Sequence, residues 1–144
     1  MIYIIRHGQT AGNHAKQLQG RRDLPLNETG RAQASAVGLW FRRQGIHIDR
    51  IFSSPLCRAV ETAELVAGDC PIQTDWRLIE MDYGPYEGMG LKNPPPEIIA
   101  FFSDFQNTPA PDGMEPLEKV VERSGDFLEE IRAEAAQKTI LIST

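Results

Sequence analysis

Short apolar runs alternate with longer stretches of helical periodicity along this chain, and the alternation limits the folds that it can adopt. The first run, Ile2–Ile5, is continuously apolar, a pattern typical of a strand that is covered on both faces. Strands that alternate with helices predict an α/β fold of three layers, in which helices flank a largely parallel central sheet. The predicted strands are residues 2–5, 48–53, 71–74 and 139–142.

Capping residues and apolar periodicity predict three main helices between these strands. Asn27 suits the N-cap of the first helix and Gly45 its C-cap, and the second helix is expected from about Leu56 to Gly68. The longest helix is expected over residues 115–137, with an apolar side made of Val120, Val121, Phe127, Leu128 and Ile131.

A length of 144 residues predicts a single domain, spanning residues 1–144. Within it, residues 84–116 hold seven of the ten prolines. A short helix is expected around Glu97 to Phe105, and the rest of this segment should be irregular. Long irregular segments in compact domains often cover or line binding sites, so we expect residues 84–116 to form a lid.

The charge and cysteine content of the chain exclude several classes of partner and site. Fifteen Lys and Arg against twenty Asp and Glu give a net charge of -5, which argues against general binding to nucleic acid or to an anionic membrane. No apolar stretch is long enough to span a membrane and no signal-peptide pattern opens the chain, so we expect a cytoplasmic protein. Cys57 and Cys70 form neither a CxxC motif nor a disulfide framework, and are expected to be packing residues.

Polar residues follow two of the predicted strands. His7 comes soon after the first strand, and Ser53 ends the second. Because the carboxyl ends of parallel strands meet at one edge of the sheet, where ligands commonly bind, we expect both residues at the same rim.

Four blocks of sequence give a stronger signal, because they occur together in a fixed order. The blocks are Arg6-His7-Gly8-Gln9-Thr10 with Asn13, Gln19 to Gly30, Ser53 to Ala59 with Thr62-Ala63, and Glu80 to Gly84 with Glu87-Gly88. In order and spacing they resemble the histidine phosphatase (phosphoglycerate mutase-like) superfamily, over residues 2 to 143. The pattern is most similar to the α-ribazole phosphatase and broad-specificity phosphatase branch, and it implies a phosphoglycerate mutase-like form of the α/β fold.

The resemblance implies roles for eight residues. In the family, the histidine of the RHG motif is the nucleophile and becomes phosphohistidine, which implies this role for His7. Glu80 corresponds to the general acid, and Arg6 and Arg58 correspond to residues that bind phosphoryl oxygens. The implied substrate contacts are Asn13, Gln19, Gly20 and Tyr83.

These residue types suit the chemistry of a phosphomonoester, which is a dianion with a poor leaving group. Transfer requires an in-line nucleophile, positive charge on the equatorial oxygens and a proton for the departing alkoxide. The imidazole of His7 must be neutral to attack, and the nearby charges of Arg6 and Arg58 favour that state. The sequence contains no evident metal cluster, and we expect no cofactor. The expected partner is a small phosphorylated metabolite, and a homodimer is left open.

One part of the family pattern is missing from this sequence. The family has a second histidine directly after the strand that corresponds to Thr139–Thr144, and the sequence ends at Thr144. Loss of one such preorganised donor costs about 10²–10³-fold in rate. The chain is therefore expected to be a C-terminally truncated part of a longer enzyme, which its apolar last strand favours, or else a short phosphate-binding domain with impaired catalysis.

The composition of residues 84–116 favours hydrolysis over mutase chemistry. A mutase must retain a phosphorylated acid, which requires basic residues on the lid, but Lys92 is the only basic residue between Gly84 and Met114. We therefore predict a phosphatase that acts on phosphomonoesters. Phosphoglycerate mutase is the alternative enzyme, and a non-catalytic domain that binds phosphorylated ligands is the alternative of a different class.

Overall fold

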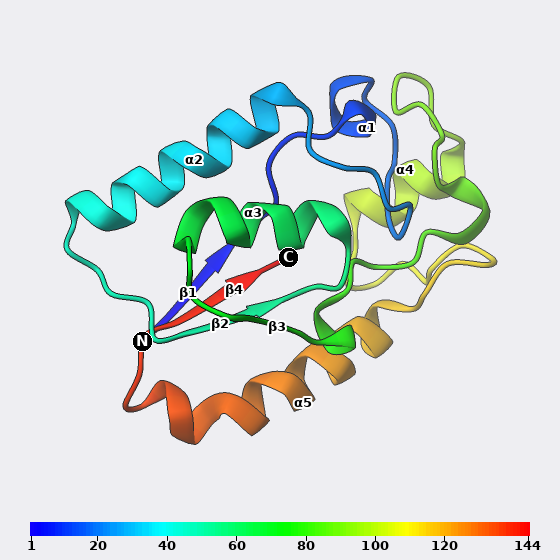
Figure 1. Ribbon diagram of the computed structural model, residues 1–144. Helices are drawn as coiled ribbons and strands as arrows, with labels where there is room; N and C mark the ends of the chain where they lie inside the picture. The colour runs from blue at the N-terminus through cyan, green and yellow to red at the C-terminus, as the bar shows by residue number, and fades with distance from the viewer.

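The computed structural model describes all residues, 1–144, and confirms the α/β class. The strands are β1 (Ile2–Ile5), β2 (Arg50–Ser53), β3 (Ile72–Thr74) and β4 (Ile140–Ser143). They form one parallel sheet in the order β1-β4-β2-β3. The last strand of the chain therefore lies between the first and the second (Figure 1).

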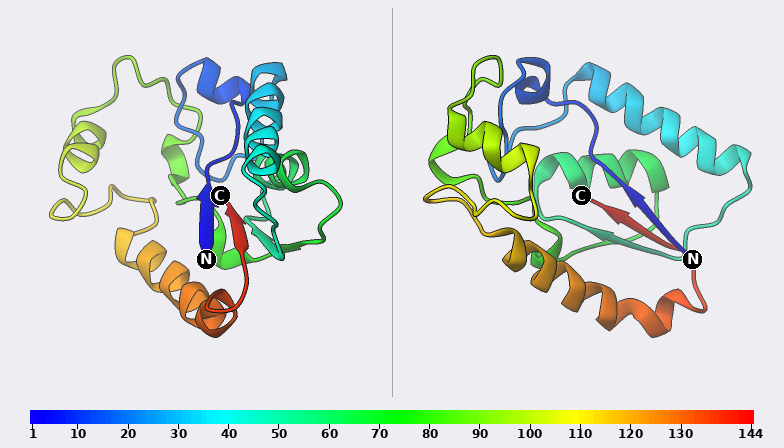
Figure 2. Two further views of the ribbon diagram at one scale, coloured as in Figure 1. Left: turned by 90° about the vertical axis from the view of Figure 1, so that its left-hand side faces the viewer. Right: turned by 180° about the vertical axis from the view of Figure 1, so that it is seen from behind.

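Helices lie on both faces of this sheet, which confirms the predicted three layers. The helices are α1 (Ala11–His14), α2 (Glu28–Arg43), α3 (Cys57–Ala67), α4 (Pro96–Ser103) and α5 (Leu117–Ala135), with short 3-10 turns at Trp76–Leu78 and Gly84–Tyr86. The pair α2 and α3 covers one face, and α5 covers the other (Figure 2). Asn27 caps α2 as predicted, because its side chain accepts a hydrogen bond of 2.8 Å from the Gly30 N–H. None of these helices combines the length and the apolar character needed to cross a bilayer.

β4 lies at the centre of the hydrophobic core, because its side chains alternate between the two faces of the sheet. Ile140 and Ile142 pack with Phe127 and Ile131 of α5. Leu141 points to the opposite face, where it packs in a second cluster with residues of α2 and α3. A strand that is buried on both faces must be apolar at successive positions, which explains the continuous apolar run in this part of the sequence.

The prediction that β1 is covered on both faces is wrong at Ile4, which is 64% exposed. β1 is an edge strand, and on the face of the sheet beneath α5 only Ile2 reaches the core cluster. Tyr3 and Ile5, on the opposite face, pack against the cluster beneath α2 and α3. An apolar run therefore marks β1 as a strand without determining how far a helix covers it.

The apolar side of α5 is also narrower than predicted. Phe127 and Ile131 face the sheet and are buried, whereas Val121 is 60% and Leu128 is 42% exposed. Val121 and Leu128 are seven residues apart and share one face of the helix. That face is turned by about 100° from the face that carries Phe127, so it points away from the sheet.

Residues 84–116 pack in a small apolar core around α4, to which Leu18 and Met81 also belong. This helix confirms the expectation of a short helix within the segment. In Figure 1, α1 and α4 lie beyond the end of the sheet to which the strand arrows point. The buried members of this core are Leu18, Met81, Ile98, Phe101 and Met114.

The close packing of α2 on α3 depends on Gly38. A Cβ atom at this position would lie 2.7 Å from the carbonyl oxygen of Leu65 and 2.9 Å from that of Val66. Main-chain atoms of α3 cannot turn aside as a flexible side chain can. We therefore expect Gly38→Ala to lower the free energy of unfolding, measured by chemical denaturation, by about 1–3 kcal/mol.

Gly125→Ala in α5 is the matched control, because no atom lies within 4 Å of a Cβ atom built there. Alanine favours a helix over glycine by up to about 1 kcal/mol, so this variant should be as stable as the parent chain or more stable. If Gly38→Ala were as stable as Gly125→Ala, the close approach of α2 to α3 would not constrain position 38.

Candidate active site

One pocket, with a volume of about 330 Å³, brings together all eight residues that the sequence pointed to. Four further residues, Lys16, Gln17, Leu18 and Leu91, line the same pocket. Ser53 lies at the end of β2 as expected, but it is buried and does not line the pocket. The eight predicted residues are Arg6, His7, Asn13, Gln19, Gly20, Arg58, Glu80 and Tyr83.

His7 follows β1 and is held firmly at the wall of this pocket. Its main-chain N–H donates a hydrogen bond of 2.7 Å to the carbonyl oxygen of Thr144, just beyond β4. Its ring Nδ1 lies 2.7 Å from the carbonyl oxygen of Gly8. A carbonyl can only accept, so Nδ1 carries the proton in this contact, and the lone pair of a neutral ring is then on Nε2.

The loop after β1 is fixed to two helices by the residue after His7. A Cβ atom on Gly8 would overlap the carbonyl group of Gly30, so the loop can approach the first turn of α2 only with glycine there. The Gly8 N–H donates to the Thr62 hydroxyl at 3.1 Å, and this hydroxyl donates to the carbonyl oxygen of Arg58 at 2.7 Å. The position of His7 relative to Arg58 is therefore determined through α3.

The surroundings of His7 favour the neutral form of its ring. Burial lowers the pKa of His7 from 6.5 to about 4. The contact with Gly8 opposes this shift, whereas the positive charges of Arg58 and Arg6 add to it. At neutral pH the ring is therefore uncharged, the state in which a histidine can act as a nucleophile.

The two arginines of the pocket differ in how far they are engaged by the protein. Arg58 is 1% exposed, and its Nη1 and Nη2 donate to the carbonyl oxygens of Arg22 and Gly20 at 2.8 and 2.7 Å. Its Nε is buried without a hydrogen-bond partner. Arg6 is exposed and makes no ion pair with the protein. Arg6 is thus free to bind an anion in the pocket, and Arg58 adds positive charge to the pocket wall together with one unpaired N–H.

Asn13 and Gln19 are arranged by a shared contact with Thr10. The Asn13 side-chain oxygen accepts from the Thr10 N–H at 3.1 Å, as part of a capping box on α1. The Gln19 side-chain oxygen accepts from the Thr10 hydroxyl at 2.6 Å. The amide N–H groups of Asn13, which are donors, make no hydrogen bond within the protein, and Asn13 lines the pocket.

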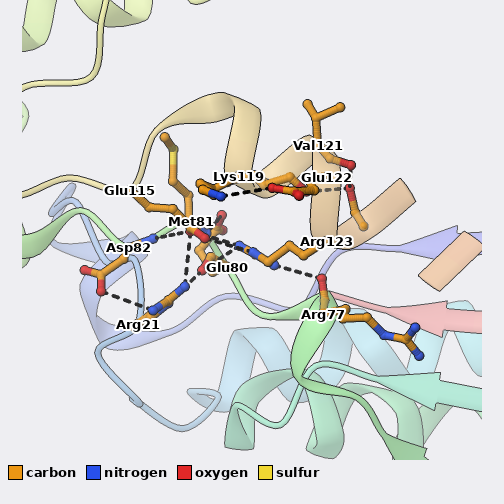
Figure 3. Close-up of polar contacts among 12 residues, drawn as sticks. Arg21, Arg77, Glu80, Met81, Asp82, Glu115, Lys119, Val121, Glu122 and Arg123 are labelled. Atoms are coloured by element: carbon orange, nitrogen blue, oxygen red, sulfur yellow. Dashed lines mark hydrogen bonds and ion pairs between the residues drawn. The ribbon is translucent and has the colours of Figure 1, made fainter. Parts of the chain in front are cut away.

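Glu80 and Tyr83 line the pocket from the segment after the 3-10 turn at Trp76–Leu78. The Glu80 carboxylate accepts from the Met81 N–H at 2.9 Å, and two guanidinium groups, of Arg21 and Arg123, approach its main-chain carbonyl (Figure 3). Burial, together with the charge of Glu80, raises the pKa of Tyr83 to about 12. Its hydroxyl therefore stays protonated at neutral pH.

Lys16 adds a third cation to the pocket, and its place there was not predicted from the sequence. It has a positive φ of 53° and its side chain makes no ion pair. Its carbonyl oxygen accepts from the Leu91 N–H at 2.8 Å, which joins this wall to the 84–116 segment. A positive φ at a lysine has no sequence signal, so only the structure could place it here.

The other two histidines and the two cysteines lie elsewhere. His14 and His47 do not line the pocket, and neither do the two cysteines. No three His, Cys, Asp or Glu side chains in the structure are grouped closely enough to hold a metal ion.

Comparisons with known proteins agree on one family. The family model of the histidine phosphatase superfamily (branch 1) matches residues 2–144. Phosphoglycerate mutase-like protein 4 of Arabidopsis thaliana is 32% identical over 150 residues, which cover 99% of this chain and 65% of that protein. A 2,3-bisphosphoglycerate-dependent phosphoglycerate mutase of Bifidobacterium longum is 34% identical over 175 residues, covering 99% of this chain and 71% of its own length. The chain thus spans about two thirds of these relatives.

Solved structures show the same fold. The phosphoglycerate mutase of Thermus thermophilus superposes with a TM-score of 0.82 at 30% identity, over 99% of this chain and 76% of the other. An Escherichia coli protein that is provisionally assigned as an alpha-ribazole-5'-P phosphatase gives a TM-score of 0.82 at 26% identity, over 98% of this chain and 71% of the other.

The buried, neutral ring of His7 should make the stability of the chain depend on pH. Between pH 6.5 and about 4 the unfolded chain binds more protons at this residue than the folded chain, so the free energy of unfolding should fall as the pH is lowered through this window. His7→Gln removes the titrating ring, and we expect it to reduce this loss by about 1–3 kcal/mol in denaturation series at successive pH values. His14→Gln, which removes an exposed histidine, should leave the loss unchanged.

Proposed function

The chain belongs to the histidine phosphatase superfamily (branch 1), and from this membership and the pocket we propose that it hydrolyses a small phosphorylated metabolite through a phosphohistidine on His7. The proposal includes no metal ion and no cofactor. It gives Arg6, Arg58 and the Asn13 amide the task of binding the phosphoryl oxygens, and Glu80 that of general acid. Gln19, Gly20 and Tyr83 are proposed to contact the substrate.

The proposed reaction has two steps. In the first, Nε2 of His7 attacks phosphorus, the bond from phosphorus to the ester oxygen breaks, and Glu80 gives its proton to the departing alkoxide. In the second, water attacks the phosphohistidine, the nitrogen–phosphorus bond breaks, and the Glu80 carboxylate takes the proton of the water. Inorganic phosphate leaves, and both His7 and Glu80 return to their starting states.

The observation that carries this proposal is the state of the His7 ring. Nδ1 is directed at the Gly8 carbonyl oxygen 2.7 Å away, and burial beside Arg58 and Arg6 keeps the ring neutral at physiological pH. Nucleophile, cations and carboxyl group also line one pocket. These features support the proposed roles of His7 as uncharged nucleophile, of Arg6 and Arg58 as the positive charge, and of Glu80 as proton donor.

The lining of the pocket supports hydrolysis rather than transfer to a second substrate oxygen. Leu91 is the only residue of the 84–116 segment in this lining, and Lys92, the one basic residue between Gly84 and Met114, is absent from it. A mutase needs cations on this side to retain the acid group of its substrate. Mutase chemistry is the second candidate because of the relatives named as phosphoglycerate mutases. Conversion of a phosphorylated acid to its isomer, without release of phosphate, would identify it.

The first test is turnover of p-nitrophenyl phosphate by the 144-residue chain with EDTA present, together with trapping of an acid-labile phosphoenzyme. We expect turnover and label on His7. His7→Ala should abolish the label and lower turnover by about 10³-fold or more. His14→Ala removes an exposed histidine and should retain both. Phosphate or vanadate binding by a folded chain that gives neither turnover nor label would favour the phosphate-binding domain instead.

A second test concerns the proton donor. If Glu80 protonates the leaving group, Glu80→Gln should slow hydrolysis of sugar or alkyl phosphates by about 10²–10⁴-fold and affect activated aryl phosphates far less. The matched control is Glu97→Gln, an exposed glutamate of α4, which should behave like the parent chain. Equal losses on both substrate classes would remove Glu80 from the role of acid.

A further inference from the structure

Four charged side chains, here called the Glu115 cluster, lie around the main chain of the segment that begins at Glu80 (Figure 3). The cluster consists of Arg21, Asp82, Glu115 and Arg123. No step of the proposed reaction uses these residues, and none of them lines the pocket. Their contacts nevertheless converge on the segment that carries the proposed acid.

Glu115 holds the two arginines in place. Arg123 donates to both of its carboxylate oxygens, from Nε at 2.9 Å and from Nη2 at 3.0 Å, and Arg21 Nη2 donates at 3.2 Å. The Glu115 and Arg123 side chains are each only 13% exposed. A two-point contact of this kind fixes orientation far better than an exposed single-point ion pair does.

The two arginines in turn hold the Glu80 carbonyl oxygen. Arg21 Nε donates to it at 3.3 Å and Arg123 Nη2 at 3.4 Å, so two guanidinium groups converge on one acceptor. Arg123 is anchored further by a hydrogen bond of 2.8 Å from Nη1 to the carbonyl oxygen of Arg77. The main chain on the carboxyl side of Glu80 is therefore fixed by groups that depend on Glu115.

Glu115 also fixes the chain two residues after Glu80. Its carboxylate accepts from the Asp82 N–H at 3.1 Å, and its own N–H donates to the Asp82 carbonyl oxygen at 2.8 Å. Burial alone would raise the pKa of Glu115, but the hydrogen bonds from Arg123 and from the Asp82 N–H lower it overall. The carboxylate is thus ionised at neutral pH and keeps all of these donors.

The Glu80 side chain has little else to hold it. Its only hydrogen bond within the protein is the one from the Met81 N–H, at 2.9 Å. The direction in which its carboxyl group points is therefore set mainly by the main chain, and that main chain is held by Arg21, Arg123 and Glu115.

We propose that Glu115 is a positioning residue for the general acid: through Arg21, Arg123 and Asp82 it fixes the main chain of Glu80, and so directs the Glu80 carboxyl group at the leaving-group oxygen. This inference rests on the proposed function. Glu115 does not touch the substrate and acts only through Glu80. Its loss should therefore harm the step that needs an acid and spare phosphate binding.

Glu115→Gln keeps the size of the side chain but removes its charge. A misplaced acid costs about 10–100-fold, so turnover of an alkyl phosphate should fall by that factor. Turnover of p-nitrophenyl phosphate and inhibition by vanadate should each change by less than about threefold. Glu130→Gln is the matched control, because it removes another arginine–glutamate pair of α5, the 2.7 Å contact with Arg77, at an exposed site.

Arg123→Lys is the second variant, in case Glu115→Gln does not fold. It keeps the positive charge but loses the two-point contact, and we expect the same selective loss on alkyl phosphates. Equal losses on alkyl and aryl substrates in a folded variant would mean that the cluster serves stability alone, which overturns the proposal while leaving the phosphatase function intact.

An NMR measurement, which does not depend on turnover, tests this inference separately from the proposed function. The ¹³C resonance of the Glu80 carboxyl group can be identified as the signal lost in Glu80→Gln. We expect it to shift in Glu115→Gln and to stay in place in Glu130→Gln. An unchanged signal in Glu115→Gln would overturn the positioning role, even for a parent chain that hydrolyses no phosphate ester.

Discussion

The insertion of β4 between β1 and β2 is the constraint on which the rest of the structure depends. No direct pairing joins β1 to β2, so the first and second strands belong to one sheet only because the last strand pairs with both. β4 also supplies Ile140 and Ile142 to one core and Leu141 to the other. The N-terminal half of the chain therefore cannot complete its fold, or place His7, until residues from the far end of the sequence arrive. Contacts of such long sequence separation slow folding but give one cooperative unit.

The pairing of β1 with β4 also positions the residues of the pocket. The Thr144 carbonyl holds the His7 main chain, while Thr62 on α3 ties the next residue to Arg58. A histidine and an arginine are thus brought together by contacts that do not involve their charges. These contacts are needed because a protonated His7 and Arg58 would repel each other, and the positive charge of Arg58 lowers the pKa of His7. Burial of His7 in its neutral form removes this repulsion, and the neutral form is the one that a nucleophile needs.

Local patterns predicted those parts of the structure that local physics determines. The alternation of apolar runs and helices predicted the α/β fold, and Asn27 caps its helix because an N-cap requires only neighbours three residues away. Sequence patterns did not predict the burial of side chains that depends on elements distant in the sequence. Ile4 is exposed because α5 does not extend over it, and Val121 because α5 has a sheet on one side only. The eight residues chosen from sequence blocks lie in one pocket, but their roles remain predictions.

The Glu115 cluster could not be predicted for a related reason. Arg21 and Asp82 lie in two of the sequence blocks, but nothing in the blocks links them to each other or to Glu115 and Arg123. Asp82 and Glu115 stand at the two ends of the 84–116 segment and bind each other's main chain. The two ends of this segment are thus joined directly to each other, and the entropic cost of closing a loop grows only slowly with its length. A change in the length of this segment should therefore cost little, whereas Ile98 and Phe101 pack with Met81, the neighbour of Glu80, and must stay apolar to keep Glu80 in place.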